Sequence, residues 1–280
     1  MKNLLIYFIS VLFVSCTTTP ITPIPNIDTN GGEEYKSHKT YIVDFDSNNN
    51  NVLVRGNEPL DADGYSAYDQ INQKLKDSLG SDFDLSNHLF IDISLISSQG
   101  PERNILFDEF LVYGYPVGDT LSSLNLNPPL GWPPFMGWNM DSTKAPWDTY
   151  FLYGNKVNVK GKMYPGFFIW WPISACPDTT QTCNDIVDMQ YGFPNLIDYI
   201  NELMTERQNT VIYFHCIHGH DRTSTVACAY QIKFQGKDFD MVTTTGAPEG
   251  GLPVKDGQPN PLTPQYWDML YIWNRDYKNK

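Results

Sequence analysis

The sequence predicts an α/β fold: a single domain in which a central twisted mixed sheet is flanked by helices. Three observations predict this class. Segments with helical spacing and segments with strand character alternate along the chain. The 280 residues, 41% hydrophobic and 14% aromatic, are enough to bury one large core. No internal repeat or second linker-like stretch divides residues 41–280, which we therefore interpret as one domain.

Residues 66–80 are predicted to form a helix. Four apolar side chains recur there at helical spacing, and a glycine follows them. These residues are Tyr68, Ile71, Leu75, Leu79 and Gly80. Residues 88–96 (HLFIDISLI) then alternate in the manner of a strand, so the chain passes from helix to strand, an order typical of α/β proteins.

Two further segments follow in the middle of the chain. Residues 105–115 (ILFDEFLVYGY) are expected to form a strand. Residues 127–147 contain too much Pro and Gly for the interior of an element, so we expect a long aromatic loop. We interpret it as a surface cover over the edge of the core; the alternative is a ligand-facing lid or a stacking surface for sugars.

The second half of the chain predicts strand, helix, strand and helix in turn. Residues 166–173 (GFFIWWPI) are a continuous apolar run suited to a buried strand. An apolar stripe at helical spacing follows over 194–204. Residues 210–214 (TVIYF) form a short buried strand, and 222–236 a helix. The residues in between therefore lie at the junction of a strand and a helix N-terminus.

This junction, residues 215–223 (HCIHGHDRT), has the chemistry of an anion site. Backbone N–H groups and the positive end of the helix dipole point into such a loop. There the thiolate of Cys216 would be stabilised as a nucleophile, and the planar fork of Arg222 would hold two phosphate oxygens. Gly219 permits a close turn, and the Thr223 hydroxyl is within plausible reach of the sulfur.

HCIHGHDRT resembles the signature of the cysteine-based protein tyrosine phosphatase superfamily: His-Cys, five residues with Gly third among them, Arg, then Ser or Thr. The resemblance covers mainly residues 168–235. It implies a protein tyrosine phosphatase-like fold and a hydrolase that works through a phosphocysteine at Cys216, with no cofactor. It also implies that His215 orients the loop and that the loop binds phosphate. The implied phosphate-binding residues are Ile217, His218, Gly219, His220, Asp221 and Arg222.

Two residues, Asp221 in the motif and Ser224 directly after it, indicate which branch of the superfamily the chain resembles. Asp221 before Arg222 is similar to lipid-phosphatase-like and bacterial lipoprotein-like branches, and we place the chain in a dual-specificity-like or bacterial lipoprotein-like branch. Ser224 stands where glycine is common, so the packing of the following helix is expected to differ. Farther on, residues 262–273 resemble a glutamine-loop helix.

In that last segment Gln265 is a candidate for positioning water. The interpretation we favour is a core-packing helix that points Trp267, Leu270 and Tyr271 inward.

The implied reaction needs a general acid, because the leaving oxygen must be protonated as the P–O bond breaks. Three aspartates precede the cysteine at suitable distances. Asp178 follows the aromatic strand and is preferred, Asp185 has the spacing of dual-specificity members, and Asp188 is closer still. Each could instead cap a helix or simply be solvated.

The three histidines His215, His218 and His220 also raise the possibility of a zinc site with Asp221. No histidine occurs after position 220, so a second set of ligands is missing and no metal site is predicted. We expect His218 and His220 to rim the phosphate pocket and to add charge at mildly acidic pH.

The N-terminus predicts export. Residues 1–15 are a signal peptide with an apolar stretch too short to span a bilayer. Residues 13–16 (FVSC) resemble a bacterial lipobox, in which Cys16 would be lipidated; cleavage of an ordinary signal and secretion is the alternative. Residues 16–40, rich in Thr, Pro, Asn and Gly, are expected to be a flexible tether that holds a membrane-anchored lipoprotein facing the outside or the periplasm.

The remaining four cysteines fall into two groups with different expected states. Cys176 and Cys183 either close a short loop as a disulfide or stay unpaired. Cys216 and Cys228 are expected to be free thiols.

The formal net charge of −13 argues against a nucleic-acid partner, because phosphate-backbone binding needs clustered Lys and Arg. We expect a monomer that contacts the membrane only through its lipid. The predicted function is hydrolysis of phosphotyrosine or phosphoserine/threonine in proteins. Phosphoinositide or inositol phosphate hydrolysis is an alternative, although basic residues near the loop are scarce. A further alternative is a non-catalytic surface lipoprotein that binds phosphate or carbohydrate.

Overall fold

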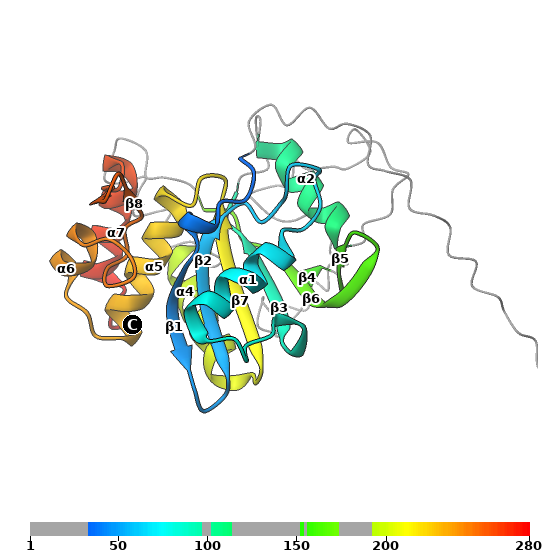
Figure 1. Ribbon diagram of the computed structural model, residues 1–280. Helices are drawn as coiled ribbons and strands as arrows, with labels where there is room; N and C mark the ends of the chain where they lie inside the picture. The colour runs from blue at the N-terminus through cyan, green and yellow to red at the C-terminus, as the bar shows by residue number, and fades with distance from the viewer. Residues whose placement is uncertain (1–32, 97–101, 114–151, 154–155, 174–191) are drawn as a thin grey trace, which may run out of the picture.

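Residues 33–96, 102–113, 152–153, 156–173 and 192–280 are described by a computed structural model (Figure 1). A seven-stranded sheet has the order β1-β2-β7-β3-β6-β4, and β5 pairs with β6. The strands are β1 Tyr41–Asp46, β2 Asn51–Asn57, β3 Leu89–Ser94, β4 Leu152–Tyr153, β5 Lys156–Val159, β6 Lys162–Trp170 and β7 Thr210–Cys216. The predicted α/β class with a central mixed sheet is confirmed.

The centre of this sheet is parallel. Strand β7 pairs in parallel with β2 on one side and with β3 on the other, and β3 pairs in parallel with β6. Strands β1, β4 and β5 pair in antiparallel fashion at the edges. Every residue of β2 and β7 is buried, as expected for parallel strands covered on both faces. The carboxyl ends of β2, β7 and β3 therefore meet at one edge of the sheet, where ligands of open α/β sheets bind.

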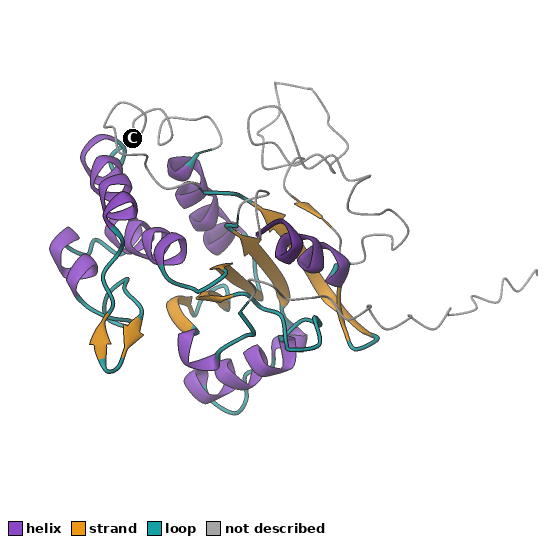
Figure 2. Ribbon diagram, turned by 90° about the horizontal axis from the view of Figure 1, so that it is seen from above, coloured by secondary structure: helices purple, strands orange, loops and turns teal. Residues whose placement is uncertain are grey.

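Helices cover both faces of the sheet (Figure 2). Helix α1 lies on one face, whereas α4 and α5 lie on the other, and α7 packs against α5. The helices are α1 Tyr68–Leu79, α2 Glu102–Val112, α4 Phe193–Glu206, α5 Asp221–Phe234, α6 Phe239–Thr244 and α7 Pro264–Asp276. The shorter elements are the 3-10 turns η1 Ser37–Lys39 and η2 Leu85–Asn87, and the strands β8 Val254–Lys255 and β9 Gln258–Pro259, which pair with each other.

Most of the elements predicted from spacing are confirmed. Helices α1, α4 and α5 and strands β3, β6 and β7 lie where the sequence places them. Gly80 ends α1 with a φ of 112°, and Pro194 stands in the first turn of α4. Strands β1 and β2 were not predicted, and β2 proves to support the loop of interest.

The strand expected over residues 105–115 is wrong, because residues 105–112 belong to helix α2, and residues 114–115 lie outside the described residues. The buried residues of the segment include Ile105, Leu106, Glu109, Val112 and Tyr113. Their offsets of one, four, seven and eight residues are those of one helix face. The high content of bulky apolar residues suggested a strand, but the spacing of the buried positions is helical.

The expected inward face of α7 is wrong in part. Leu270 is buried as predicted, whereas Trp267 and Tyr271 are 39% and 44% exposed. Their rings stack on each other with centroids 5.3 Å apart and lie edge-on to Phe239 of α6. The face turned to the core holds Tyr266, Met269, Leu270, Ile272 and Trp273.

Part of the segment expected to be tether packs on the fold. Residues 33–40 lie at the end of the sheet where β2 and β7 finish, and Tyr35 is buried there (Figure 1). The Asn57 side chain accepts from the Lys36 N–H at 2.9 Å and donates to the carbonyl of Glu34 at 3.0 Å, which supplies the hydrogen bonds that this backbone needs. The packed part of the chain therefore begins before residue 41.

Several sequence expectations lie outside the described residues. These are Cys16 and the signal peptide, the aromatic loop 127–147, and Cys176 with Cys183. Within the described part of the chain, Cys216 and Cys228 are both free and buried, as expected. A search of the same residues finds no helix with the length and apolar character needed to cross a membrane.

Candidate active site

The loop that joins β7 to α5 lies at the carboxyl edge of the parallel strands. Cys216 is the last residue of β7, and the 14-residue helix α5 begins at Asp221. The chain turns between them at Gly219, whose φ is 62°. A Cβ atom at Gly219 would lie 2.7 Å from the carbonyl oxygen of Gly56 and 2.8 Å from the Asn57 nitrogen, both at the end of β2. Glycine is therefore required there both by the backbone angle and by the space available.

The thiol of Cys216 is 6% exposed and has a hydrogen-bond donor directed at it. The Thr223 hydroxyl, in the first turn of α5, donates to Cys216 Sγ at 3.2 Å. The sulfur thus lies at the N-terminal end of a long helix, where the dipole and the unpaired N–H groups favour negative charge. The Thr223 hydroxyl and the N-terminus of α5 are therefore both directed at the sulfur.

Arg222 is fixed by two partners from distant parts of the chain. Its Nη1 donates to Glu102 Oε1 at 2.8 Å, and its Nε donates to the Tyr266 hydroxyl at 3.0 Å. Burial lowers the pKa of Arg222, but Tyr266 and Glu102 outweigh that effect and leave the pKa above its ordinary value. The guanidinium is therefore a permanent cation beside the loop. The sequence did not mark Glu102 or Tyr266 as its partners.

His215 is buried beneath the loop among carboxylates that the sequence did not single out. Its Nε2 lies 3.0 Å from Asp92 Oδ1 on β3 and 3.5 Å from Glu109 Oε1 on α2. The Tyr113 hydroxyl donates to the other oxygen of Asp92 at 3.1 Å. Burial raises the pKa of Glu109 well above its ordinary value, and that of the neighbouring Glu58 to about 8. A buried set of acidic groups therefore surrounds the histidine that precedes the cysteine.

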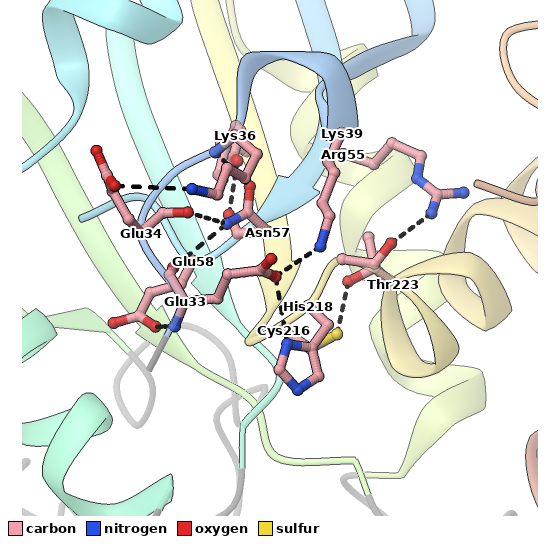
Figure 3. Close-up of polar contacts among 12 residues, drawn as sticks. Glu33, Glu34, Lys36, Lys39, Arg55, Asn57, Glu58, Cys216, His218 and Thr223 are labelled. Atoms are coloured by element: carbon pink, nitrogen blue, oxygen red, sulfur yellow. Dashed lines mark hydrogen bonds and ion pairs between the residues drawn. The ribbon is translucent and has the colours of Figure 1, made fainter. Parts of the chain in front are cut away.

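The mouth of the loop carries a small charged cluster (Figure 3). The Glu33 carboxylate lies between two basic side chains: Lys39 Nζ is 2.6 Å away and His218 Nδ1 is 3.3 Å away. The chain fold thus brings a lysine to the loop from a position far away in the sequence. His218 is exposed, in keeping with a place at the rim.

The remaining loop side chains tie the loop to the segment before α7. His220 Nε2 donates to the carbonyl of Pro261 at 3.0 Å, and Asp221 Oδ1 accepts from the Thr263 N–H at 2.9 Å. The Asp221 carboxylate therefore faces the backbone of the segment before α7. At Asp221 only the backbone N–H is left for an anion in the loop. Gln265, the candidate water-positioning residue, is exposed on α7.

A buried arginine supports the loop from below. Arg55 in β2 donates to the carbonyl of Gly219 at 2.8 Å and to the Ser224 hydroxyl at 2.9 Å. The sequence analysis missed this residue. The available signal was a charged residue within the apolar run 52–56 (VLVRG), because arginine is almost never fully buried without a partner.

The structure brings together Cys216, Arg222, Thr223, Gly219 and His215. The candidate general acids Asp178, Asp185 and Asp188 lie outside the described residues. Within the described ranges, no group of three His, Cys, Asp or Glu side chains is arranged to hold a metal ion.

Comparison with solved structures finds structural likeness. No family model and no curated protein matches the sequence. The chain is similar to the crystal structure of Trypanosoma brucei protein tyrosine phosphatase TbPTP1, at 12% sequence identity. The alignment covers 82% of this chain and 72% of that chain, with a TM-score of 0.34.

Proposed function

We propose that this protein is a phosphatase that hydrolyses phosphoesters through a phosphocysteine intermediate at Cys216. The observation that carries the proposal is the Thr223 hydroxyl, 3.2 Å from Cys216 Sγ at the N-terminus of α5. A donor to the sulfur and a helix N-terminus stabilise the thiolate, and Arg222 adds a fixed cation. A merely buried cysteine would need none of these groups.

In the proposed reaction the Cys216 thiolate attacks phosphorus. A P–S bond forms as the P–O ester bond breaks, and the leaving oxygen takes a proton from a general acid, for which Asp178 is preferred and Asp185 is the alternative. Water then attacks phosphorus and gives a proton to the carboxylate that the general acid became in the first step; the P–S bond breaks, inorganic phosphate leaves, and the Cys216 thiolate is restored. Arg222 and the loop N–H groups would hold the non-bridging oxygens, and Thr223 would stabilise the departing thiolate.

Phosphorylated proteins are the proposed substrates. Two basic side chains, Lys39 and His218, lie at the described mouth of the loop, and they share the Glu33 carboxylate. A substrate with several phosphates would need more free positive charge than this. Export, and anchorage through a lipid on Cys16, complete the proposal and place the enzyme on the outer or periplasmic side of a membrane.

The test is hydrolysis of para-nitrophenyl phosphate by the full chain, in reducing buffer with a chelator. Cys216→Ser is compared with Cys228→Ser, which changes the other buried free thiol. We expect the wild type and Cys228→Ser to turn over with the chelator present, and Cys216→Ser to lose activity. Mass spectrometry after an acid quench should find phosphate on the peptide that contains Cys216. Activity that requires metal, or that survives Cys216→Ser, would overturn the mechanism; phosphate binding without turnover would favour the non-catalytic alternative.

A further inference from the structure

Arg55 is a buried cation with only neutral hydrogen-bond acceptors. Its side chain is 1% exposed, and its guanidinium donates to the carbonyls of Gly219 and Gly251 and to the hydroxyl of Ser224. In the part of the chain that the structure describes, no carboxylate pairs with it. Burying a charge without an ion pair is costly, so the position of Arg55 calls for an explanation beyond packing.

The charge of Arg55 persists at neutral pH. Burial lowers its pKa to about 10, which still leaves the guanidinium protonated. The ionisable groups that favour its charged form are Cys228, Cys216, Tyr41 and Tyr213. Burial raises the pKa of Cys228 to about 12, so that thiol stays neutral, and phenols are neutral near pH 7. Among these four groups of the described residues, Cys216 is the proposed nucleophile, and a negative charge on its sulfur would be attracted to Arg55.

The hydrogen bonds of Arg55 also fix the direction of the loop backbone. Because the Gly219 carbonyl points down to Arg55, it is turned away from the mouth of the loop. The contact with Ser224 attaches the same guanidinium to the first turn of α5. Serine replaces the glycine that is common at this position of the resembled motif, and its hydroxyl is the acceptor that Arg55 uses. Arg55 and Ser224 therefore act as a matched pair.

We propose that Arg55 is a positioning residue of the phosphate loop: it fixes the Gly219 carbonyl and the start of α5, and its charge favours an anion at Cys216. The inference rests on the proposed function for its catalytic meaning. Its two physical consequences, stronger binding of an oxyanion and a more reactive sulfur, hold whether or not the protein turns over a substrate.

The test compares Arg55→Met, Arg55→Lys and the control Arg275→Met, which changes an exposed arginine at the end of α7. Three quantities are measured on the full chain: binding of inorganic phosphate by calorimetry, the rate of iodoacetamide alkylation at Cys216 at neutral pH, and para-nitrophenyl phosphate kinetics. Arg55→Met should weaken phosphate binding and slow alkylation by about 10-fold each, the loss expected for hydrogen bonds and charge acting on an anion.

Arg55→Lys should recover the alkylation rate, because it keeps the charge, but not kcat, because an ammonium group cannot serve three fixed acceptors. Arg275→Met should behave as the wild type does.

A folded Arg55→Met with wild-type phosphate affinity and a wild-type alkylation rate overturns the inference, even if turnover is lost. If Arg55→Met does not fold, Ser224→Ala decides: about a threefold loss of phosphate affinity supports the pairing, and wild-type affinity overturns it. Absence of turnover in the wild type would reject the phosphatase proposal and leave the measurements of phosphate binding and of the alkylation rate valid.

Discussion

Glu58, which follows β2 beside the loop, makes the stability of the protein depend on pH in a predictable way. Its side chain is 4% exposed, and burial raises its pKa from 4.5 to about 8. Between these values the folded protein holds a proton that the unfolded chain has released. The free energy of unfolding therefore contains a contribution that is fully present below pH 4.5 and is lost as the pH rises through 8. The difference between the two pKa values corresponds to about 5 kcal/mol.

The substitution Glu58→Gln removes this titration and keeps the shape of the protonated acid. It also keeps a side-chain oxygen that can accept from the Glu33 N–H, which in the wild type lies 3.3 Å from Glu58 Oε2. We expect the wild type and the variant to have similar free energies of unfolding at pH 4.5, and the variant to be more stable by several kcal/mol at pH 8.5, as measured by urea denaturation. Glu34→Gln, at a half-exposed carboxylate in the neighbouring segment, is the matched control. The reasoning fails if Glu58→Gln changes stability equally at both pH values.

Three further predictions concern the loop. Thr223→Val removes the donor to Cys216 and should lower kcat for an aryl phosphate by about 10-fold, whereas Thr223→Ser should keep most of it; equal rates in all three proteins would contradict the proposed hydrogen bond. Gly219→Ala should lower the free energy of unfolding by about 1–3 kcal/mol in urea denaturation and weaken phosphate binding, because its Cβ meets the backbone of β2. Gly257→Ala, also at positive φ but in open space, should leave phosphate binding unchanged, and equal binding by both alanine variants would refute the steric argument. Glu33→Gln removes the carboxylate that Lys39 and His218 share at the loop mouth and should lower KM about twofold at low salt, with the gain disappearing at high salt; a gain that persists at high salt would show that the effect is not one of charge.

The sequence predicts the strand, the glycine turn and the helix start around Cys216 because these features are local. A short apolar strand, a glycine and a helix start lie within one continuous stretch, and each follows from spacing and residue type. The contact between Thr223 and Cys216 belongs to this class, since a helix start fixes both residues. The same holds for the strands and helices on either side, whose apolar residues repeat regularly.

The supporting residues could not be predicted because their partners are set by the pairing of distant strands. Arg55 meets Gly219 only because β2 lies beside β7, and Asp92 meets His215 only because β3 lies on the other side. Nothing local to Glu109 indicates a buried contact with His215, and the segment that contains it was read as a strand. Strand order is a property of the whole fold, so these contacts appear only when the tertiary structure is known.

The pairing of β2 with β7 also determines when, during folding, the cysteine can become reactive. The Tyr213 hydroxyl donates to the carbonyl of Asn57 across a separation of 156 residues, and the turn at Gly219 rests on the same end of β2. Contacts this distant in sequence close large loops and form slowly. A chain in which only β7 and α5 have formed lacks β2, the strand against which the turn at Gly219 packs. The rate at which Cys216 reacts with a thiol reagent should therefore report the completion of the sheet, and it offers a kinetic probe of the final, long-range step of folding.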